Sequence, residues 1–530
     1  MLELILGWRM IKTARKDWEL VKKIKHGLQA VRGVRTVFLI LLSFSPILPG
    51  FPLLAQSPAA RIDARLNTVP FNRQLWGIAL LDQNGRLVYG RNESRLFIPA
   101  SNTKLIVSAV ASALLPPDWR VKTSVYGGPV VGGILQGDLV LYGRGDPTMD
   151  KRCYAADSTL AGVCDVDPFV RVRQLAQGLR AKGVRVVSGD IVGDGSYFEP
   201  TLVHPNWEAF DLNWWYAAPV SGLGFHDNSI DVDWQPGPAV GAPAVIAITP
   251  DLGDIGFENR TLTVAPGGES DIGDRFFRQP GTLQIWAEGT VALDNPRRTE
   301  SFAVPDPSLF AARALRQALA DVGIAVTGTT RSTTDSLLYA HVRASPPLAE
   351  VLSRPLRDWI FPILNTSQNW FAEMLLKQLG RQFGKAGSWP EGLAVERRFL
   401  IDSIRVDSTQ FSLSDGSGLS SSNLVSPLAF TQVLRFMRTH PRSATFAAAL
   451  PVSGLAGSLR NRFLGTPLNG RVRAKTGSIA RVQSLSGYIE LDGGKSLTFS
   501  VEANNHAENS KVMLNAIDSV VVELGKGGKR

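Results

Sequence analysis

The most informative segment of this 530-residue chain reads Phe97-Ile98-Pro99-Ala100-Ser101-Asn102-Thr103-Lys104-Leu105-Ile106-Val107-Ser108-Ala109. A proline and a small residue precede a run of good helix formers, which predicts a helix that begins beside Ser101. Positions i and i+3 share a helix face, so we expect Lys104 to lie beside Ser101. A serine becomes a nucleophile when an adjacent base takes its proton, and a buried lysine of lowered pKa can be that base. Taken alone, the pattern also fits a capped helix start with a solvated lysine.

A second segment, Ser367-Gln368-Asn369, precedes an apolar run from Trp370 that we interpret as a helix closing at Gly380. A hydroxyl and an amide projecting from the turn before a helix can pass a proton to a leaving amine and hold a substrate carbonyl. An ordinary Ser or Asn helix cap is the alternative. Ser421-Ser422-Asn423 also spells Ser-x-Asn, but it ranks second because it lies in a Ser/Gly-rich loop.

The third segment is Lys475-Thr476-Gly477. It lies in alternating sequence that continues through the turn Asp492-Gly493-Gly494, which predicts antiparallel strands joined by a hairpin. A lysine and a threonine on such a strand could grip a substrate carboxylate, and Gly477 would let a substrate backbone approach closely. The alternative is a surface lysine that blunts a sheet edge.

In this order the three segments match the Ser-x-x-Lys, Ser-x-Asn and Lys-Thr-Gly set of penicillin-binding proteins and class A β-lactamases. Three further stretches narrow the match. With them, the chain resembles the penicillin-binding protein 4 (DacB-type) D-alanyl-D-alanine carboxypeptidase/endopeptidase family over roughly residues 60 to 520. Gln368 departs from the family pattern, because relatives often carry Asp at this variable position. The three further stretches that narrow the match to this family are Gly137–Pro147, Tyr216–Leu223 and Asp415–Ser420.

The resemblance implies an acyl-serine reaction on peptidoglycan peptides. Neutral Lys104 would withdraw the proton of Ser101 as Ser101 attacks the carbonyl between two D-alanines. Ser367, with Lys475 nearby, would pass a proton to the leaving amine, and water would then hydrolyse the acyl-enzyme. β-Lactams would acylate the same serine. A serine β-lactamase or esterase, or a catalytically silent cell-wall-binding protein, is the alternative.

The resemblance also implies how substrate is held. Backbone N–H groups of Ser101 and Ser478 would form the oxyanion hole. Asn369 would hold the substrate amide, while Lys475 and Thr476 would hold the terminal carboxylate. The expected site residues are therefore Ser101, Lys104, Ser367, Asn369, Lys475, Thr476, Gly477 and Ser478. No Cys/His cluster has zinc-ligand spacing, the six histidines are scattered and the sequence has no glycine-rich nucleotide loop, so we expect neither a metal nor a cofactor.

The expected fold class is α/β (α+β), a penicillin-binding/β-lactamase-like transpeptidase domain whose antiparallel sheet is flanked by helices. Lys104 and Ser367 are 263 positions apart, which implies a large insert between the first two motifs. We predict a catalytic domain from residues 57–125 and 345–530, and a mostly β insert from 126–344 that forms one or two subdomains. Within it, helices are expected near 170–183 and 308–323. A strand pair at 75–89 and a terminal helix at 509–524 are expected in the catalytic domain. The apolar stripe of that helix, expected to pack on the sheet, is Val512, Leu514, Ile517, Val520 and Val521.

An aromatic-rich stretch, Trp207 to Tyr216, lies inside the predicted insert. It reads either as packing between the insert and the catalytic domain or as a wall of the substrate cleft. In the second interpretation, Asp211 would meet a cationic amine of a muropeptide side chain.

Charge is concentrated at the N-terminus. The chain has a net charge of +10, but removing the nine Lys/Arg and three Asp/Glu of residues 1–35 leaves 48 basic and 44 acidic residues. This balance removes the main argument for nucleic-acid binding. The uncharged run 36–55 resembles a signal-peptide core with cleavage after Ala55, so residues 1–56 predict export to the periplasm, with a loose membrane tether as the alternative. Cys153 and Cys164 could form a disulfide there or remain free thiols, and the sequence does not indicate an oligomeric state.

Overall fold

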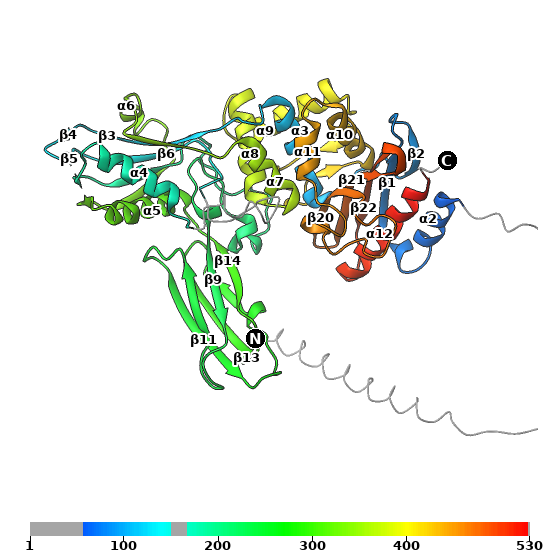
Figure 1. Ribbon diagram of the computed structural model, residues 1–530, viewed down its shortest axis with the longest axis horizontal. Helices are drawn as coiled ribbons and strands as arrows, with labels where there is room; N and C mark the ends of the chain where they lie inside the picture. Colours follow the sequence, from blue (N-terminus) through cyan, green and yellow to red (C-terminus); the bar gives the residue numbers. More distant parts are fainter. Residues whose placement is uncertain (1–56, 150–166, 528–530) are drawn as a thin grey trace, which may run out of the picture. The chain divides into compact units, whose positions relative to one another are not determined.

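The computed structural model describes residues 57–149 and 167–527 (Figure 1). The predicted signal segment and Cys153 and Cys164 lie outside the described residues. Among the described residues, no helix is both long enough and apolar enough to span a membrane.

The first motif and the last motif meet on one antiparallel sheet of strand order β2-β1-β22-β21-β20. Residues from opposite ends of the chain pair directly in it, since Leu75 lies opposite Asn504. The sheet confirms the predicted strand pair and the predicted hairpin, and it leaves β20 at an edge. Its strands are β1 (Leu75–Leu81), β2 (Leu87–Arg91), β20 (Val472–Ile479), β21 (Val482–Glu490) and β22 (Ser496–Asn504).

One face of this sheet is covered by α2 (Pro58–Leu66) and α12 (Ser510–Gly527). The terminal helix was predicted, but its apolar stripe is rotated from the predicted one. Val512 and Leu514 are only partly buried, whereas Met513 and Leu524 join the core together with Ile517, Val520 and Val521. The rotation leaves Leu514 at the surface of the helix.

The other face carries the helices that hold the first two motifs. α10 contacts β1 and β22, and α3 contacts α8 and α10, so these helices share one apolar core. The helices on this side are α3 (Lys104–Leu114), α7 (Leu356–Asn365), α8 (Asn369–Phe383), α9 (Trp389–Phe399), α10 (Pro427–Thr439) and α11 (Ser443–Ala449). An antiparallel sheet flanked by helices is the predicted fold class, which is confirmed.

The predicted end of α8 at Gly380 is wrong, because the helix continues to Phe383. A Cβ at Gly380 would lie 2.7 Å from the carbonyl oxygen of Ala386 and 2.7 Å from the backbone nitrogen of Gly392. The glycine therefore permits the close approach of α9 rather than ending the helix.

The chain between the first two motifs builds further sheets. A five-stranded sheet, β16-β8-β6-β3-β17, and a four-stranded sheet, β15-β7-β5-β4, pack with α4 (Val170–Ala181) and α5 (Pro307–Asp321), which confirms both predicted helices. The strands are β3 (Lys122–Gly127), β4 (Val130–Val131), β5 (Ile134–Leu135), β6 (Leu139–Gly143), β7 (Val186–Val187), β8 (Ile191–Asp194), β15 (Ala325–Val326), β16 (Thr330–Thr333) and β17 (Ala349–Leu352).

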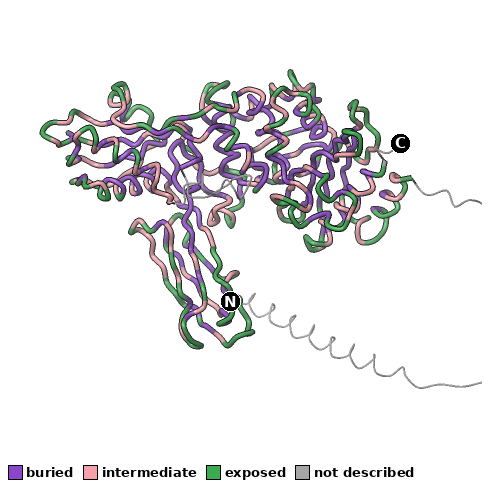
Figure 2. The backbone as a smooth tube through the Cα atoms, in the orientation of Figure 1, coloured by how far each residue is buried: buried purple, intermediate pink, exposed green. Residues whose placement is uncertain are grey.

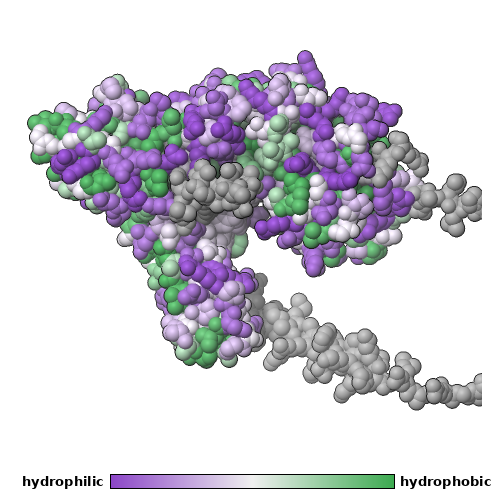
Figure 3. Space-filling view, viewed as in Figure 1, coloured by the Kyte–Doolittle hydropathy of each residue, from purple (hydrophilic) through white to green (hydrophobic). Residues whose placement is uncertain are grey.

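Two three-stranded sheets, β10-β9-β14 and β11-β13-β12, occupy residues 229–303. Their strands are β9 (Ser229–Gln235), β10 (Val245–Thr249), β11 (Gly256–Val264), β12 (Phe276–Arg278), β13 (Gln284–Ala292) and β14 (Arg298–Ala303). Figure 2 shows buried backbone along the strands and inner helices, and exposed backbone at turns. Hydrophilic residues dominate the face seen in Figure 3, with small apolar patches between them.

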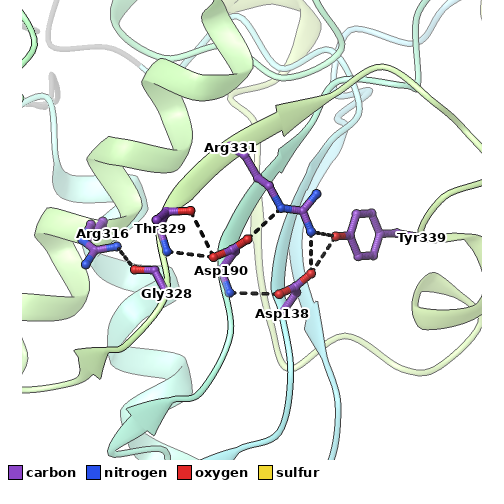
Figure 4. Close-up of polar contacts among 7 residues, drawn as sticks. All are labelled: Asp138, Asp190, Arg316, Gly328, Thr329, Arg331 and Tyr339. Carbon is purple, nitrogen blue, oxygen red and sulfur yellow. Dashed lines mark hydrogen bonds and ion pairs between the residues drawn. The ribbon is translucent and has the colours of Figure 1, made fainter.

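A charged network ties the five-stranded sheet together (Figure 4). Arg331 on β16 donates from Nε to Asp190 Oδ2 over 2.9 Å and from Nη2 to Asp138 Oδ2 over 2.6 Å. The hydroxyl of Tyr339 donates to the same Asp138 oxygen. Asp138 belongs to the Gly137–Pro147 stretch, so this part of the resemblance carries a structural role.

Candidate active site

Ser101 lies in the short helical turn η2 (Ala100–Thr103), and α3 begins directly after it at Lys104. The preceding Ala100 has φ +48°, a left-handed conformation that is uncommon for a residue with a side chain. Lys104 Nζ donates to Ser101 Oγ over 2.8 Å, so the i, i+3 spacing places the predicted base in contact with the predicted nucleophile.

Lys104 is fully buried and makes two more hydrogen bonds. Its Nζ donates to Asn369 Oδ1 over 2.6 Å and to the carbonyl oxygen of Ser417 over 2.6 Å. Burial lowers the pKa of Lys104 to about 7, against the opposing effect of the negative charges of Asp415 and Glu373. The neutral amine that a general base requires is therefore accessible near neutral pH.

A second lysine–serine pair lies on the other side of the site. Lys475 Nζ donates to Ser367 Oγ over 2.8 Å and to the carbonyl oxygen of Thr476 over 2.7 Å. Burial and the positive charge of Lys104 hold the pKa of Lys475 well below its usual value. Ser367 has φ +66°, so both serines of the site lie at or beside a left-handed residue. Such conformations are often concentrated at active sites.

Asn369 connects the first motif to the aromatic-rich stretch. Its Oδ1 accepts from Lys104, and its Nδ2 donates to the carbonyl oxygen of Tyr216 over 2.7 Å. Gln368 points elsewhere: it caps α8 by accepting from the Trp370 backbone and donates to Asp227 over 2.7 Å. The variable position of the motif is therefore structural.

The rival triplet Ser421-Ser422-Asn423 is not joined to Ser101 or Lys475. Asn423 is buried and donates to Asp415 and to the carbonyl oxygen of Ser420, so it closes its own loop. The geometry thus favours Ser367 and Asn369 as the Ser-x-Asn pair.

β20 carries the third motif along the edge of the sheet. Thr476 Oγ1 donates to Ser458 Oγ over 2.9 Å, and Ser478 Oγ accepts from Gln483 Nε2 over 2.9 Å. A Cβ at Gly477 would lie 2.5 Å from the carbonyl oxygen of Pro99. The glycine is required where β20 packs on the segment before Ser101, a reason that the sequence did not indicate.

Asp211 is connected to the motifs through Tyr216. It accepts a 2.9 Å hydrogen bond from the hydroxyl of Tyr216, whose backbone carbonyl binds Asn369. Desolvation and the nearby charge of Glu208 raise the pKa of Asp211, against the opposing Tyr216 hydrogen bond. Asp211 is thus linked to the site through Tyr216, and its role in substrate binding stays a prediction.

Sequence reasoning missed Glu373, a buried carboxylate behind Lys104. Its oxygens accept from the backbone N–H of Ser417 over 2.7 Å and of Gly416 over 3.1 Å. These bonds orient the Ser417 carbonyl that accepts from Lys104. Glu373 follows Asn369 by four residues, so it shares the inner face of α8, and this spacing was the available signal.

Asp415 organises the same loop. It accepts from the backbone N–H of Gly418 and of Ser420, each over 2.7 Å. Trp207 Nε1 also donates to it over 3.0 Å, which joins the aromatic-rich stretch to the loop. Trp207 therefore takes part in packing between the two regions. No group of three or more His, Cys, Asp or Glu side chains in 57–149 and 167–527 could hold a metal.

Known proteins are similar to this chain over most of its length. The family model described as "D-Ala-D-Ala carboxypeptidase 3 (S13) family" matches residues 59–524. The D-alanyl-D-alanine carboxypeptidase of Actinomadura sp. (strain R39) is 30% identical over 94% of this chain and 91% of its own length. The DacB carboxypeptidase of Haemophilus influenzae is 24% identical over 89% of this chain and 92% of its own length.

The fold is also similar to a solved structure. The crystal structure of penicillin binding protein 4 from Haemophilus influenzae superposes with a TM-score of 0.71, at 21% identity, over 87% of this chain and 97% of that chain. The family match over nearly the whole described chain agrees with the geometry of the two lysine–serine pairs. The chain belongs to the D-Ala-D-Ala carboxypeptidase 3 (S13) family.

Proposed function

We propose that the protein is a serine-type D-alanyl-D-alanine carboxypeptidase and endopeptidase that acts on peptidoglycan stem peptides and cross-links and is acylated by β-lactams. The observation that carries the proposal is the 2.8 Å contact between Ser101 Oγ and the buried amine of Lys104. Relatives named as D-alanyl-D-alanine carboxypeptidases support the substrate class.

In the acylation step, neutral Lys104 takes the Ser101 proton while Ser101 Oγ attacks the carbonyl between the two D-alanines. The backbone N–H groups of Ser101 and Ser478 receive the oxyanion, because fixed donors stabilise charge that develops in the transition state. The bond to the leaving amine then breaks as Ser367 gives its proton to that amine and takes a replacement from Lys475, which is protonated beside the substrate carboxylate and donates to Ser367 Oγ. The proton taken from Ser101 stays on Lys104. An acyl-enzyme on Ser101 remains, and water hydrolyses it.

Substrate is held along the edge of β20 in this proposal. Asn369 binds the substrate amide, and Lys475 and Thr476 bind the terminal carboxylate. Asp211 receives the cationic amine of the stem-peptide side chain, which a half-buried carboxylate beside aromatic rings suits.

The test is mass spectrometry of residues 57–530 after brief exposure to benzylpenicillin, alongside Ser101→Ala. We expect a long-lived adduct on the peptide that contains Ser101 and none on the variant, with D-alanine release from a stem pentapeptide lost in parallel. Rapid loss of the drug without an adduct would indicate a β-lactamase. A folded protein that neither binds nor consumes the drug would indicate a silent wall-binding protein.

We also propose export to the periplasm. The support is sequence alone: a basic segment followed by the uncharged run 36–55. N-terminal sequencing of protein from the periplasmic fraction should begin near Gln56. Recovery of the full-length chain with the membrane would favour the tethered alternative.

A further inference from the structure

A groove of about 980 Å³ lies between α12 and the loop 457–466. Its wall on α12 runs from Ser510 to Glu523, roughly 20 Å at 1.5 Å per residue. An extended peptide rises about 3.3 Å per residue, so the groove has room for about five or six residues. The groove is therefore as long as a short peptide.

The groove adjoins the part of β20 that carries Thr476 and Ser478. Ser458 lines one wall and accepts the 2.9 Å hydrogen bond of Thr476 Oγ1. Ser510 lines the other wall, and Gln483 Nε2 bridges Ser510 Oγ over 3.4 Å and Ser478 Oγ over 2.9 Å. The first wall is thus hydrogen-bonded directly to β20, the strand that receives the substrate carboxylate in the proposed reaction, and the second wall is connected to it through Gln483 of β21.

The groove has more free positive charge than free negative charge. Its acids are paired, since Asp518 binds Arg462 over 2.5 Å and Glu523 binds Arg61 over 2.6 Å. Arg65 and Lys511 are exposed in the groove, and within 57–149 and 167–527 neither has a carboxylate at ion-pair distance. Two uncompensated cations suit an occupant that carries carboxylates.

The two reactions of the proposed function, release of a terminal D-alanine and cleavage of a cross-link, differ in the size of the leaving group. Release of a terminal D-alanine needs space for one small residue beyond the scissile bond. Cleavage of a cross-link instead releases an amine that belongs to a second stem peptide, and that peptide must lie beyond the carboxylate site. Stem peptides are short and carry carboxylates, which matches the length and charge of the groove.

We propose that the groove between α12 and the loop 457–466 binds the leaving stem peptide when the enzyme cleaves a peptidoglycan cross-link. This inference rests on the proposed function and deepens it. It assigns Arg65 and Lys511 to recognition of the leaving peptide, together with the exposed apolar side chain of Leu464. Neither cation takes part in the acylation of Ser101.

The test compares Arg65→Glu/Lys511→Glu with a control of equal charge change, Arg73→Glu/Lys495→Glu, both in the full mature chain. Arg73 and Lys495 are exposed and do not line the groove. Three reactions are measured at low salt: cleavage of a purified cross-linked muropeptide dimer, D-alanine release from a stem pentapeptide, and acylation by benzylpenicillin. Circular dichroism checks that all variants are folded.

We expect the groove variant to cleave the dimer with a kcat/KM about five- to twentyfold lower than wild type, because two exposed charge contacts become repulsive. D-Alanine release and acylation should stay within about twofold of wild type. The loss should shrink at 0.5 M salt, where exposed charges are screened, and the control variant should match wild type in all three reactions.

An unchanged dimer cleavage in the groove variant would overturn the inference, as would an equal fall in D-alanine release. A wild-type enzyme that releases D-alanine but does not cleave the dimer would overturn it while leaving the carboxypeptidase activity standing. Failure of all three wild-type reactions would refute the proposed function itself.

Discussion

At the scale of single residues, the site is defined by two buried lysines that each donate to a serine. Lys104 and Lys475 are completely buried, and both have lowered pKa values because water is excluded from the amines. Two buried cations close together would repel, so neutrality of at least one is favourable. Glu373 and Asp415 oppose this trend for Lys104, which leaves its pKa at about 7.

The first prediction concerns the pH dependence of acylation. The rate constant for benzylpenicillin acylation of wild type should rise with pH through about 7, because only neutral Lys104 can accept the Ser101 proton. Burial, and next the charge of Asp415, raise the pKa of Glu373 itself to about 7, so Glu373 carries only part of a negative charge where Lys104 titrates. Glu373→Gln removes that partial charge, which raises the pKa of Lys104, so this rise should shift modestly to lower pH. The plateau should fall roughly tenfold, since one backbone N–H of the 416–417 loop loses its acceptor.

Glu396→Gln is the matched control for Glu373→Gln. Glu396 is buried near Glu373, and desolvation, followed by the charges of Glu373 and Asp415, raises its pKa well above the usual value. The raised pKa favours the protonated, uncharged form, so replacement of Glu396 by Gln should leave the pH midpoint of acylation in place. Equal shifts in the two variants, measured by stopped-flow acylation, would contradict the role given to Glu373.

At the scale of elements, the nucleophile is held by contacts of η2 with two segments that are distant in sequence. A Cβ at Gly418 would lie 1.8 Å from the carbonyl oxygen of Ala100, and one at Gly477 would lie 2.5 Å from that of Pro99. The 415–420 loop and β20 therefore both pack against the backbone immediately before Ser101. The position of the nucleophile depends on these close approaches.

The second prediction tests the contact at Gly418. Gly418→Ala should lower the benzylpenicillin acylation rate at least tenfold, because the new methyl group must displace Ala100 and with it Ser101. Gly323→Ala is the control, since Gly323 has a similar φ of +73° but nothing within 4 Å of its Cβ position. It should cost about 1–2 kcal/mol of stability from the left-handed conformation alone and keep normal acylation. Equal acylation by both variants would exclude the packing explanation.

At the scale of the whole molecule, buried polar contacts join α8 to the chain between the first two motifs. Lys377 is buried and donates to the carbonyl oxygen of Thr201 over 3.0 Å, while its amine lies 3.2 Å from Glu199. Gln378 Nε2 donates to the carbonyl oxygen of Arg144 over 2.6 Å. These contacts lie in the second half of α8, so the helix is anchored there as well as at Asn369, its first residue.

The third prediction follows from removing a buried lysine of this set. Lys377→Met should lower the free energy of unfolding by about 1–3 kcal/mol, because the half-buried Glu199 would lose its cation and keep the Trp389 backbone N–H, and the Thr201 carbonyl would lose its lysine donor. The double variant Lys377→Met/Glu199→Gln should recover part of this loss. A single variant as stable as wild type in urea denaturation would show that the pair contributes nothing.

The fourth prediction links stability to pH through Glu396. Neither of its carboxylate oxygens has a hydrogen-bond partner among the described residues, and its raised pKa means that the folded state retains the proton. An unfolded glutamate loses that proton above about pH 4.3, so the contribution of this group to stability is complete below that pH. It then falls by up to about 1.4 kcal/mol per pH unit as pH rises toward the folded-state pKa.

Glu396→Gln removes this pH dependence. Relative to wild type, the variant should therefore be more stable at pH 8 than at pH 5, as measured by urea denaturation at both values. A stability difference that does not change with pH would mean that Glu396 is ionised in the folded protein.

Local sequence predicted the features that depend on residues close together in the chain. The i, i+3 spacing of Ser101 and Lys104 needs only a helical turn, and the alternation around Asp492-Gly493-Gly494 needs only a hairpin. The apolar stripe of α12 was predicted with a rotated face, because a helix with apolar residues on several sides takes its orientation from the sheet it covers. Its partly buried Leu514 lines the groove wall.

Tertiary structure alone decided the features that join distant parts of the chain. Lys104 meets the Ser417 carbonyl across 313 positions, and no local pattern encodes such a contact. The role of Glu373 and the continuation of α8 through Gly380 both depend on neighbouring segments in the folded core. The sequence already ranked Ser367 above Ser421, but only the fold places Ser367 beside Lys475. Short-range patterns fix which residue types are available, whereas packing fixes which of them share one buried, desolvated site.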